Sequence, residues 1–363
     1  MTNLQRLSSR EECERLICYV PPRRLLGEVG LGLLVSLVWL AGGLPAAEPN
    51  GDPAVSGELY VRVKQTAVEV LVDDHLKGSG NMIAAEGLAI TAAHVIGRPG
   101  ARVELLSPLA GRRKAEVVAV DLGHDLALLR AESREGGYPF LPLANALPPA
   151  GGEVYLVGTP IFRHAVMFRG IVACETPTFE HLNPGYVAVL TLAATVPSGT
   201  SGGAWVDRQG ALIGVQSGVM SNNGIPVGVS FAGLVSGVQR LLETQQTAST
   251  PNLGTAVEET WQQGRDILDR FPPQTEGLIV KVLQADGPAA RGGLKQFDLI
   301  IEVDGQAVRL PDELLRRVRQ KKPGESVSLT VLGPDGTGKR QVVVTLGRLE
   351  TGWPEPAADG KGQ

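Results

Sequence analysis

The stretch SGTSGGA, residues 198–204, places Ser201 between glycines. Glycine adopts backbone conformations that other residues avoid, so this spacing allows a tight turn with the Oγ atom of Ser201 exposed. In such a turn the backbone N–H groups of Gly199 and Ser201 point at one spot, where they would stabilise an oxyanion. The stretch therefore predicts a nucleophilic serine with its own oxyanion hole.

Two other stretches supply what acyl transfer needs besides a nucleophile: a general base, and an acid that orients it. In AITAAHVI, residues 89–96, a turn of small residues follows a strand pattern and presents His94 to a cleft. In GHDLALL, residues 123–129, Asp125 stands ahead of an apolar strand, which permits a buried carboxylate. The chain order of histidine, aspartate and serine is that of chymotrypsin-type barrels. We therefore predict a catalytic triad of His94, Asp125 and Ser201.

Other reactive residues receive structural interpretations. Asp121 is expected in a turn, without the apolar strand that directly follows Asp125. His124 is expected at the surface, because neighbouring residues of a strand face opposite ways. Cys174 stands far from the other two cysteines and is expected to be a buried small hydrophobic residue. No disulfide framework is predicted, and the triad chemistry requires no metal or cofactor.

Composition and spacing favour a mostly β chain with two domains. The 363 residues exceed one comfortable domain, and 46 Gly with 25 Pro favour many short strands. A helical pattern over 232–245 and a polar stretch after it mark the boundary between the domains. Apolar segments predict strands over 68–72, 87–91, 117–120, 126–129, 154–157, 186–192, 212–216, 227–229, 277–283, 299–303, 326–332 and 341–346, and a second helix over 310–320.

The N-terminal segment predicts a membrane anchor. Residues 29–47 are uncharged and long enough to cross a bilayer as a helix. Arginines precede this run and acidic residues follow it, which places the N-terminus in the cytoplasm. A cleaved signal peptide is the alternative, because LPAA at 44–47 has the small residues of a cleavage site. A buried core helix ranks third, because polar, turn-forming residues follow directly.

These patterns divide the chain into segments. We expect a cytoplasmic segment over 1–24, a transmembrane anchor or signal sequence over 25–47, linkers over 48–57 and 246–251, a protease domain over 58–245, a second domain over 252–349, and a disordered tail over 350–363. The formal net charge of −4 is small and no basic run occurs, so nucleic acid is excluded as a partner.

Three motifs together resemble the HtrA/DegP family of trypsin-like proteases: TAAHVI at 91–96, HDLALL at 124–129 and GTSGGA at 199–204. The resemblance spans roughly residues 60–348 and implies a chymotrypsin-like double β-barrel. The chain departs from the family pattern around the serine, with Pro197 and Ser198 in place of an Asn-Pro pair.

The second domain resembles a PDZ domain, which binds a peptide C-terminus as an added strand. NLGT at 252–255 is similar to the carboxylate-binding loop, with Leu253 and Gly254 at its core. The run from GPAA at 287–290 to VDG at 303–305 is similar to further PDZ signatures. The insertion between Thr255 and Gly277 is expected to form a helix that covers the domain.

The resemblance implies an endopeptidase that cleaves unfolded or misfolded proteins outside the cytoplasm, anchored in the inner membrane by a single pass. It further implies a PDZ domain that recruits chain termini or regulates activity, and assembly as a trimer. A non-catalytic peptide-binding scaffold and a narrow regulatory protease acting on a membrane partner are the alternatives. If the barrel geometry carries over, a substrate pocket is expected from Thr195, Val215, Gln216 and Ser217. These residues carry no acid, which implies small or aliphatic side chains before the cleaved bond.

Overall fold

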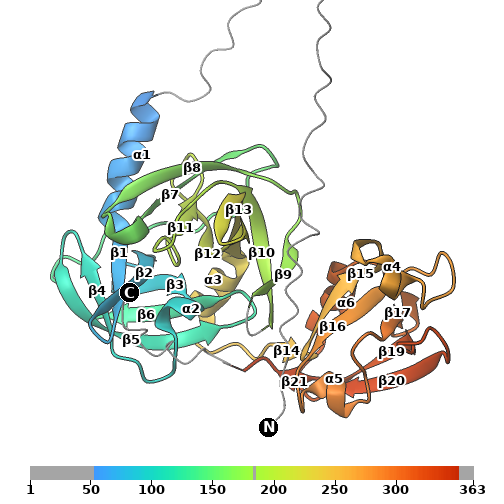
Figure 1. Ribbon diagram of the computed structural model, residues 1–363. Helices are drawn as coiled ribbons and strands as arrows, with labels where there is room; N and C mark the ends of the chain where they lie inside the picture. The colour runs from blue at the N-terminus through green and yellow to red at the C-terminus, as the bar shows by residue number, and fades with distance from the viewer. Residues whose placement is uncertain (1–52, 183–184, 351–363) are drawn as a thin grey trace, which may run out of the picture. The chain divides into compact units, whose positions relative to one another are not determined.

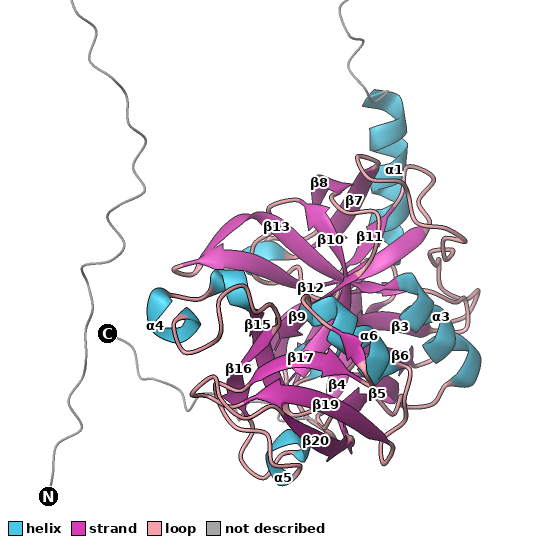
Figure 2. Cartoon of the chain, turned by 90° about the vertical axis from the view of Figure 1, so that its right-hand side faces the viewer, coloured by secondary structure: helices cyan, strands magenta, loops and turns pink. Residues whose placement is uncertain are grey.

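The computed structural model describes residues 53–182 and 185–350. The chain divides into a unit over 1–50 and a unit over 51–363, and the description below concerns the second. The predicted cytoplasmic segment, the anchor and nearly all of the predicted tail therefore lie outside the described residues. Within the described ranges, no helix combines the length and the apolar character that crossing a bilayer requires. Strands dominate the described part (Figure 2), in agreement with the predicted mostly β class.

The first barrel is a closed ring of antiparallel strands in the order β1-β2-β3-β6-β5-β4 (Figure 1). Its strands are β1 (Ala67–Val72), β2 (His75–Met82), β3 (Leu88–Ala92), β4 (Val103–Ser107), β5 (Gly111–Asp121) and β6 (Leu126–Ala131). Burial alternates along β1, so its valines at 68, 70 and 72 point into the barrel while the residues between them face outward. The short helix α2 (Ala93–Ile96) follows β3 directly.

A second ring of strands follows in the chain. Its sheet runs β13-β12-β11-β7-β8-β10-β9, and β13 also pairs with β10, which closes the ring. The strands are β7 (Glu153–Gly158), β8 (Val166–Val172), β9 (Thr178–Leu182), β10 (Gly185–Ala193), β11 (Ala204–Val206), β12 (Leu212–Asn222) and β13 (Ile225–Leu234); the 3-10 helix η1 (Pro160–Phe162) lies between β7 and β8. Trp205 is fully buried in its core. Two barrels therefore form, as the resemblance implied.

Helices pack at the ends of the two barrels. Helix α1 (Pro53–Thr66) begins inside the stretch predicted to be a linker, and it buries Leu59 and Val63 in the shared core. Helix α3 (Val235–Thr244) begins three residues later than the predicted helix, because β13 continues to Leu234 in its pairing with β12. Leu241, on the inner face of α3, is wholly buried in that same core.

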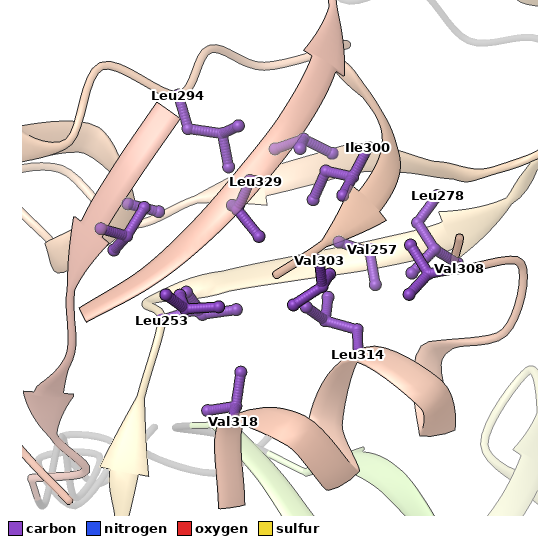
Figure 3. Packing of buried hydrophobic residues seen from close by; sticks show 14 of the residues in the cluster. Leu253, Val257, Leu278, Leu294, Ile300, Val303, Val308, Leu314, Val318 and Leu329 are labelled. Atoms are coloured by element: carbon purple, nitrogen blue, oxygen red, sulfur yellow. The ribbon is translucent and has the colours of Figure 1, made fainter. Parts of the chain in front are cut away.

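The C-terminal domain, residues 251–348, is a sheet in the order β15-β16-β17-β19-β20 with helices around it. Its elements are β14 (Pro251–Asn252), β15 (Thr255–Glu259), η2 (Thr260–Gln262), α4 (Arg265–Leu268), β16 (Leu278–Leu283), α5 (Pro288–Arg291), β17 (Leu299–Val303), β18 (Gln306–Ala307), α6 (Pro311–Arg319), β19 (Ser326–Leu332), β20 (Arg340–Thr345) and β21 (Gly347–Arg348). Apolar side chains from the strands and from α6 meet in one core (Figure 3).

Two expectations differ from the structure. The insertion after Thr255 forms β15, η2 and the single turn α4 rather than one covering helix, although Ile267 and Phe271 do pack against the sheet. Cys174 is exposed, not buried, because it follows the end of β8 and lies outside the barrel wall.

Candidate active site

Strand pairing brings the predicted base and acid together. Ala92 at the end of β3 pairs with Leu126 at the start of β6, so the residues just beyond each strand end are neighbours. His94 lies in α2, directly after β3, and Asp125 lies in the turn before β6 with φ of 54°. The Nδ1 atom of His94 is 2.7 Å from Oδ2 of Asp125, and the backbone N–H of His94 donates to Oδ1 at 3.0 Å. One carboxylate therefore holds both the ring and the backbone of His94.

A third donor reaches the same carboxylate. Asp125 is buried, and its Oδ2 atom also accepts a hydrogen bond from the Oγ atom of Ser217. Ser217 was predicted to line the substrate pocket, and it instead supports the triad acid. Burial lowers the pKa of His94, but the charge of Asp125 and its hydrogen bond outweigh burial, so the pKa is raised above its ordinary value of 6.5. The protonated imidazole, the form produced when Ser201 is deprotonated, is thus stabilised.

The glycines around Ser201 are required by space as well as by conformation. Gly199 has φ of 94°, and a Cβ atom there would lie 2.4 Å from the carbonyl oxygen of Thr159. Gly202 has φ of 85°, and a Cβ atom there would lie 2.1 Å from Oγ1 of Thr91. A side chain at Gly202 would push the turn away from the first barrel, and one at Gly199 would push it away from the segment that follows β7.

The turn leaves two donors free. In the described part of the chain, the N–H groups of Gly199 and Ser201 make no hydrogen bond, whereas the next N–H, of Gly202, donates to the carbonyl of Gln216 at 2.7 Å. Among the described residues, no hydrogen bond joins His94 to Ser201. Catalytic hydrogen bonds are often long in a free enzyme and tighten with substrate bound. The structure thus shows a histidine oriented by a buried carboxylate, and a serine turn whose N–H groups at Gly199 and Ser201 have no partner among the described residues.

Comparisons with known proteins agree with this geometry. A family model described as a trypsin-like peptidase domain matches residues 78–215, and one described as a PDZ domain matches residues 251–343. A probable periplasmic serine endoprotease, DegP-like, from Halomonas elongata is 31% identical over 283 residues, which cover 77% of this chain and 57% of that protein. The chain belongs to the HtrA/DegP-like family. A protein of the same description from Pseudomonas fluorescens is also 31% identical, over 280 residues, 75% of this chain and 56% of its own length.

The chain thus spans just over half the length of these relatives. Solved structures share the fold of the HtrA/DegP-like chain. An HtrA-type protease AlgW with a decapeptide has a TM-score of 0.58 at 23% identity and covers 80% of this chain and 98% of that one. The serine endoprotease from Yersinia pestis has a TM-score of 0.57 at 23% identity, covering 83% and 100%.

The peptidase domain, which comprises both barrels with α1 and α3, places the predicted pocket residues differently. Thr195 is exposed, and Oγ1 of Thr195 lies 3.8 Å from the position that a Cβ atom on Gly228 would take. Val215 is fully buried in the core, and the amide of Gln216 bonds to Trp205 and to the carbonyl of Gly218. Of the four predicted pocket residues, Thr195 is exposed and the other three are buried, and Gly228 lies opposite Thr195.

The residues around Asp121 also differ from expectation. Asp121 is the last residue of β5 rather than a turn residue, and it is fully buried. It accepts hydrogen bonds from Nδ1 of His124 at 2.8 Å and from Arg240. His124 lies in the turn after β5, and its side chain is only 18% exposed. This second histidine–aspartate pair is structural, because Arg240 rather than a serine completes it.

Of the two residues predicted for the carboxylate-binding loop of the PDZ domain, Leu253 lines a pocket between β15 and α6, and Gly254 follows it in the chain. Leu253 is buried and lines a small pocket with Val257 of β15 and with Leu314, Leu315 and Val318 of α6 (Figure 3). Gly254 has φ of 73°, and its N–H donates to the side chain of Asn252 at 3.1 Å. Tyr186 of β10 also lines this pocket, and its hydroxyl accepts from the N–H of Val257 at 2.9 Å and donates to the carbonyl of Val257 at 3.3 Å.

Proposed function

We propose that the chain is a serine endopeptidase that hydrolyses unfolded or misfolded proteins outside the cytoplasm. One arrangement carries the proposal: Asp125 holds the His94 ring at 2.7 Å, and the N–H groups of Gly199 and Ser201 are unpartnered among the described residues. All of these residues lie in the range that the trypsin-like family model matches. The compartment is supported by the relatives, which are described as periplasmic serine endoproteases.

The mechanism follows from the roles that these atoms have. Ser201 Oγ attacks the scissile carbonyl while Nε2 of His94 takes its proton, and the negative charge that forms on the carbonyl oxygen is stabilised by the N–H groups of Gly199 and Ser201. The same imidazolium then gives its proton to the leaving amine, and an acyl group remains on Ser201. Water, activated by His94, releases the acyl group and restores the serine. Asp125 keeps the proton of His94 on Nδ1 throughout.

The scaffold alternative requires a collapsed serine turn. The free N–H groups of Gly199 and Ser201 argue against collapse, because a collapsed turn would use these donors internally. Thr200, which differs from the family pattern, turns its side chain to the carbonyl of Pro197 at 2.8 Å and leaves the oxyanion hole unobstructed. Catalysis is therefore the better reading of this turn.

The full chain, solubilised in detergent, should cleave casein with an acid limb whose midpoint lies above pH 6.5. The pKa of His94 is raised by Asp125 despite burial, so the free base is lost as the pH falls through that raised value. The measurement is kcat/KM for casein or a fluorogenic peptide between pH 5 and 9. The exposed His75, replaced by alanine, is the matched control and should leave the limb unchanged. An acid limb centred below pH 6 would contradict the assignment, and no cleavage at any pH would contradict the function.

Location and assembly are proposals as well. We place residues 25–47 in the inner membrane with the N-terminus in the cytoplasm. The uncharged run and the arginines that precede it support this placement. We also propose a trimer. Protease protection in spheroplasts tests the topology, because external protease should remove the folded domains only if they are periplasmic. Light scattering of the solubilised chain tests the trimer, and a monomer would contradict it.

The PDZ domain is proposed to take peptide C-termini along β15. This strand is the edge of its sheet, so Val257 has a backbone N–H and a carbonyl available to an added strand. Both groups bond to the Tyr186 hydroxyl, and the Tyr186 ring lies in the groove between β15 and α6. A peptide must displace this side chain to bind, so Tyr186 lowers the affinity of the groove.

Replacing Tyr186 with phenylalanine should tighten binding of a peptide C-terminus about tenfold. Two hydrogen bonds to Val257 are lost from the free protein, and each contributes roughly 1 kcal/mol or less. The measurement is the fluorescence anisotropy of a labelled decapeptide that ends in valine. Tyr60→Phe, which also loses a hydroxyl bond to a backbone carbonyl, is the matched control and should not change affinity. Equal affinity in Tyr186→Phe and wild type would show that the hydroxyl does not compete with peptide.

A further inference from the structure

The GSG sequence at 78–80 in β2 lies against the serine turn, although it supplies none of the triad. Ser79 is 1% exposed. Its backbone N–H donates to the carbonyl of Ser201 at 2.8 Å. Its Oγ atom donates to the carbonyl of Gly199 at 2.9 Å and accepts from the N–H of Thr159 at 3.0 Å. One residue of the first barrel thus contacts the nucleophile turn at two carbonyls.

The hydrogen bonds that fix the carbonyl groups of the serine turn also fix the directions of the N–H groups of Gly199 and Ser201. In a planar trans peptide the C=O and the following N–H point in opposite directions. The carbonyl of Ser198 accepts from the N–H of Ile161 at 2.9 Å, so the N–H of Gly199 is turned away from Ile161. The carbonyl of Thr200 accepts from Gly203 at 3.0 Å, which turns the N–H of Ser201 in the same manner. The Gly199–Thr200 peptide lies between these two peptides. Its carbonyl accepts from the hydroxyl of Ser79 at 2.9 Å, and its N–H, that of Thr200, donates to the carbonyl of Pro197 over a longer distance of 3.4 Å.

Gly78 allows β2 to approach the serine turn this closely, and Gly80 allows it to lie close to β3. A Cβ atom on Gly78 would lie 2.7 Å from the carbonyl oxygen of Ser201, and one on Gly80 would lie 2.9 Å from that of Ile90. Thr91 fixes the other face of the strand, because its Oγ1 donates to the carbonyl of Ser79 at 2.7 Å. The GSG sequence therefore brings the β2 backbone close to the serine turn and directs the hydroxyl of Ser79 at that turn.

The segment from Thr159 to Ile161, which Ser79 also contacts, has a strained backbone that surrounding contacts must hold. Ile161 has φ of 44°, which is unfavourable for a β-branched residue and persists only where surrounding contacts impose it. Thr159 supplies two such contacts: its N–H bonds to Ser79, and its Oγ1 donates to Oε1 of Glu69 at 3.0 Å. The Glu69 carboxylate also contacts His164. Ser79 therefore joins this strained segment to the serine turn.

We propose that Ser79 is a positioning residue for the oxyanion hole: its hydroxyl ties the N–H of Thr159 to the carbonyl of Gly199 and so keeps the N–H groups of Gly199 and Ser201 convergent. The inference rests on the proposed endopeptidase function, because the hole matters to catalysis only if Ser201 is acylated. The effect is exerted through the backbone, and Ser79 itself does not touch the substrate.

The test compares Ser79→Ala and Ser79→Cys with wild type on a fluorogenic peptide that has valine before the cleaved bond. Removing a direct oxyanion donor costs about 10²–10³ in kcat, so losing the group that positions the donors should cost roughly 10–100-fold in kcat at unchanged KM. A peptidyl valine aldehyde, which forms a tetrahedral adduct, should lose affinity by the same factor, while the matching alcohol binds as before. The thiol of Ser79→Cys, a weak donor, should give an intermediate kcat.

Thr330→Ala is the matched control. Thr330 is equally buried, donates to the carboxylate of Glu302 at 2.7 Å and accepts from the amide of Gln341 at 2.9 Å, so the variant loses one donated and one accepted bond within the PDZ domain. It should lose stability and keep its kcat. Equal loss of aldehyde and alcohol affinity in Ser79→Ala, or a wild-type kcat, would overturn the proposal while leaving the endopeptidase standing.

A wild-type chain that neither cleaves the peptide nor binds the aldehyde would instead refute the endopeptidase. Crystal structures of the wild type and of Ser79→Ala then decide the positioning role alone. A rotated Gly199 carbonyl in the variant supports it, and an unchanged carbonyl overturns it.

Discussion

Replacing Ser201 with alanine should lower the rate of casein cleavage by about a million-fold, since loss of the nucleophile costs about as much as loss of a whole triad. The methyl group of alanine has no proton for His94 to take and no oxygen to carry an acyl group. The oxyanion hole stays intact, because its two donors are backbone N–H groups. The measurement is the appearance of casein fragments with the full chain, beside thermal unfolding of the same preparation.

The Ser236→Ala variant is the control, because Ser236 is exposed on α3 and belongs to no part of the site. It should cleave casein at the wild-type rate. Unfolding temperatures of all three proteins should agree, because Ser201 makes no side-chain hydrogen bond within the described residues. Cleavage by Ser201→Ala at an undiminished rate would assign the activity to another residue or to a contaminating protease.

Replacing Asp125 with asparagine should lower kcat by about 10⁴-fold without unfolding the protein, as the corresponding change does in the Ser-His-Asp template. The Asp125 carboxylate accepts from the ring of His94, from its backbone N–H and from Ser217. The side-chain NH2 group of asparagine would replace one carboxylate oxygen, so it would face one of these N–H or O–H donors and could not accept its hydrogen bond. His94 would then carry its proton on the wrong nitrogen, and the variant would also lose the negative charge that raises its pKa. The residual acid limb should move to lower pH.

Asp121→Asn separates this effect from the loss of any buried carboxylate. Asp121 is as buried as Asp125 and also bonds to a histidine, but its other partner is Arg240. Its pKa is lowered: burial opposes ionisation, but His124 and Arg240 outweigh it, so the variant should lose stability at neutral pH. Its kcat should stay near wild type. A comparable fall in kcat for both variants would show that Asp125 acts through stability alone.

The contact between His94 and Asp125 and the tight turn at Ser201 could be predicted from the sequence, because each residue lies in a locally distinctive stretch. Glycines surround Ser201, and an apolar strand follows Asp125 directly. Strand β2 was missed for the opposite reason: HLKGSGNM contains two glycines, which are atypical of a strand interior, yet Gly78 serves close approach to the serine turn and Gly80 close approach to β3. Helix α1 was missed over its whole length. Only Leu59, Val63 and Thr66 of its residues 57–66 are buried, so its hydrophobic pattern is weak.

The pocket could not be predicted residue by residue, because it depends on irregular strand pairing. A register shift between Gln216 and Gly218 of β12 changes which side chains face the core. Val215 and Gln216 therefore turn inward, and Ser217 meets Asp125. Such a shift follows from long-range contacts of β12 with β13, which no local pattern encodes. Leu253 could be predicted because it lies in a short motif of the PDZ domain. Tyr186, which lines the same pocket, could not be predicted because it comes from β10, far away in the sequence.

The division of the catalytic groups between the barrels has a consequence for folding. His94 and Asp125 belong to the first barrel and Ser201 to the second, and the serine turn takes its shape from Ser79 and Thr91 of the first. Neither barrel alone contains a competent centre. Enzymatic turnover recovered after dilution from denaturant would therefore report the docking of the two halves, a step later than the formation of either, and would lag behind the return of strand signal in circular dichroism.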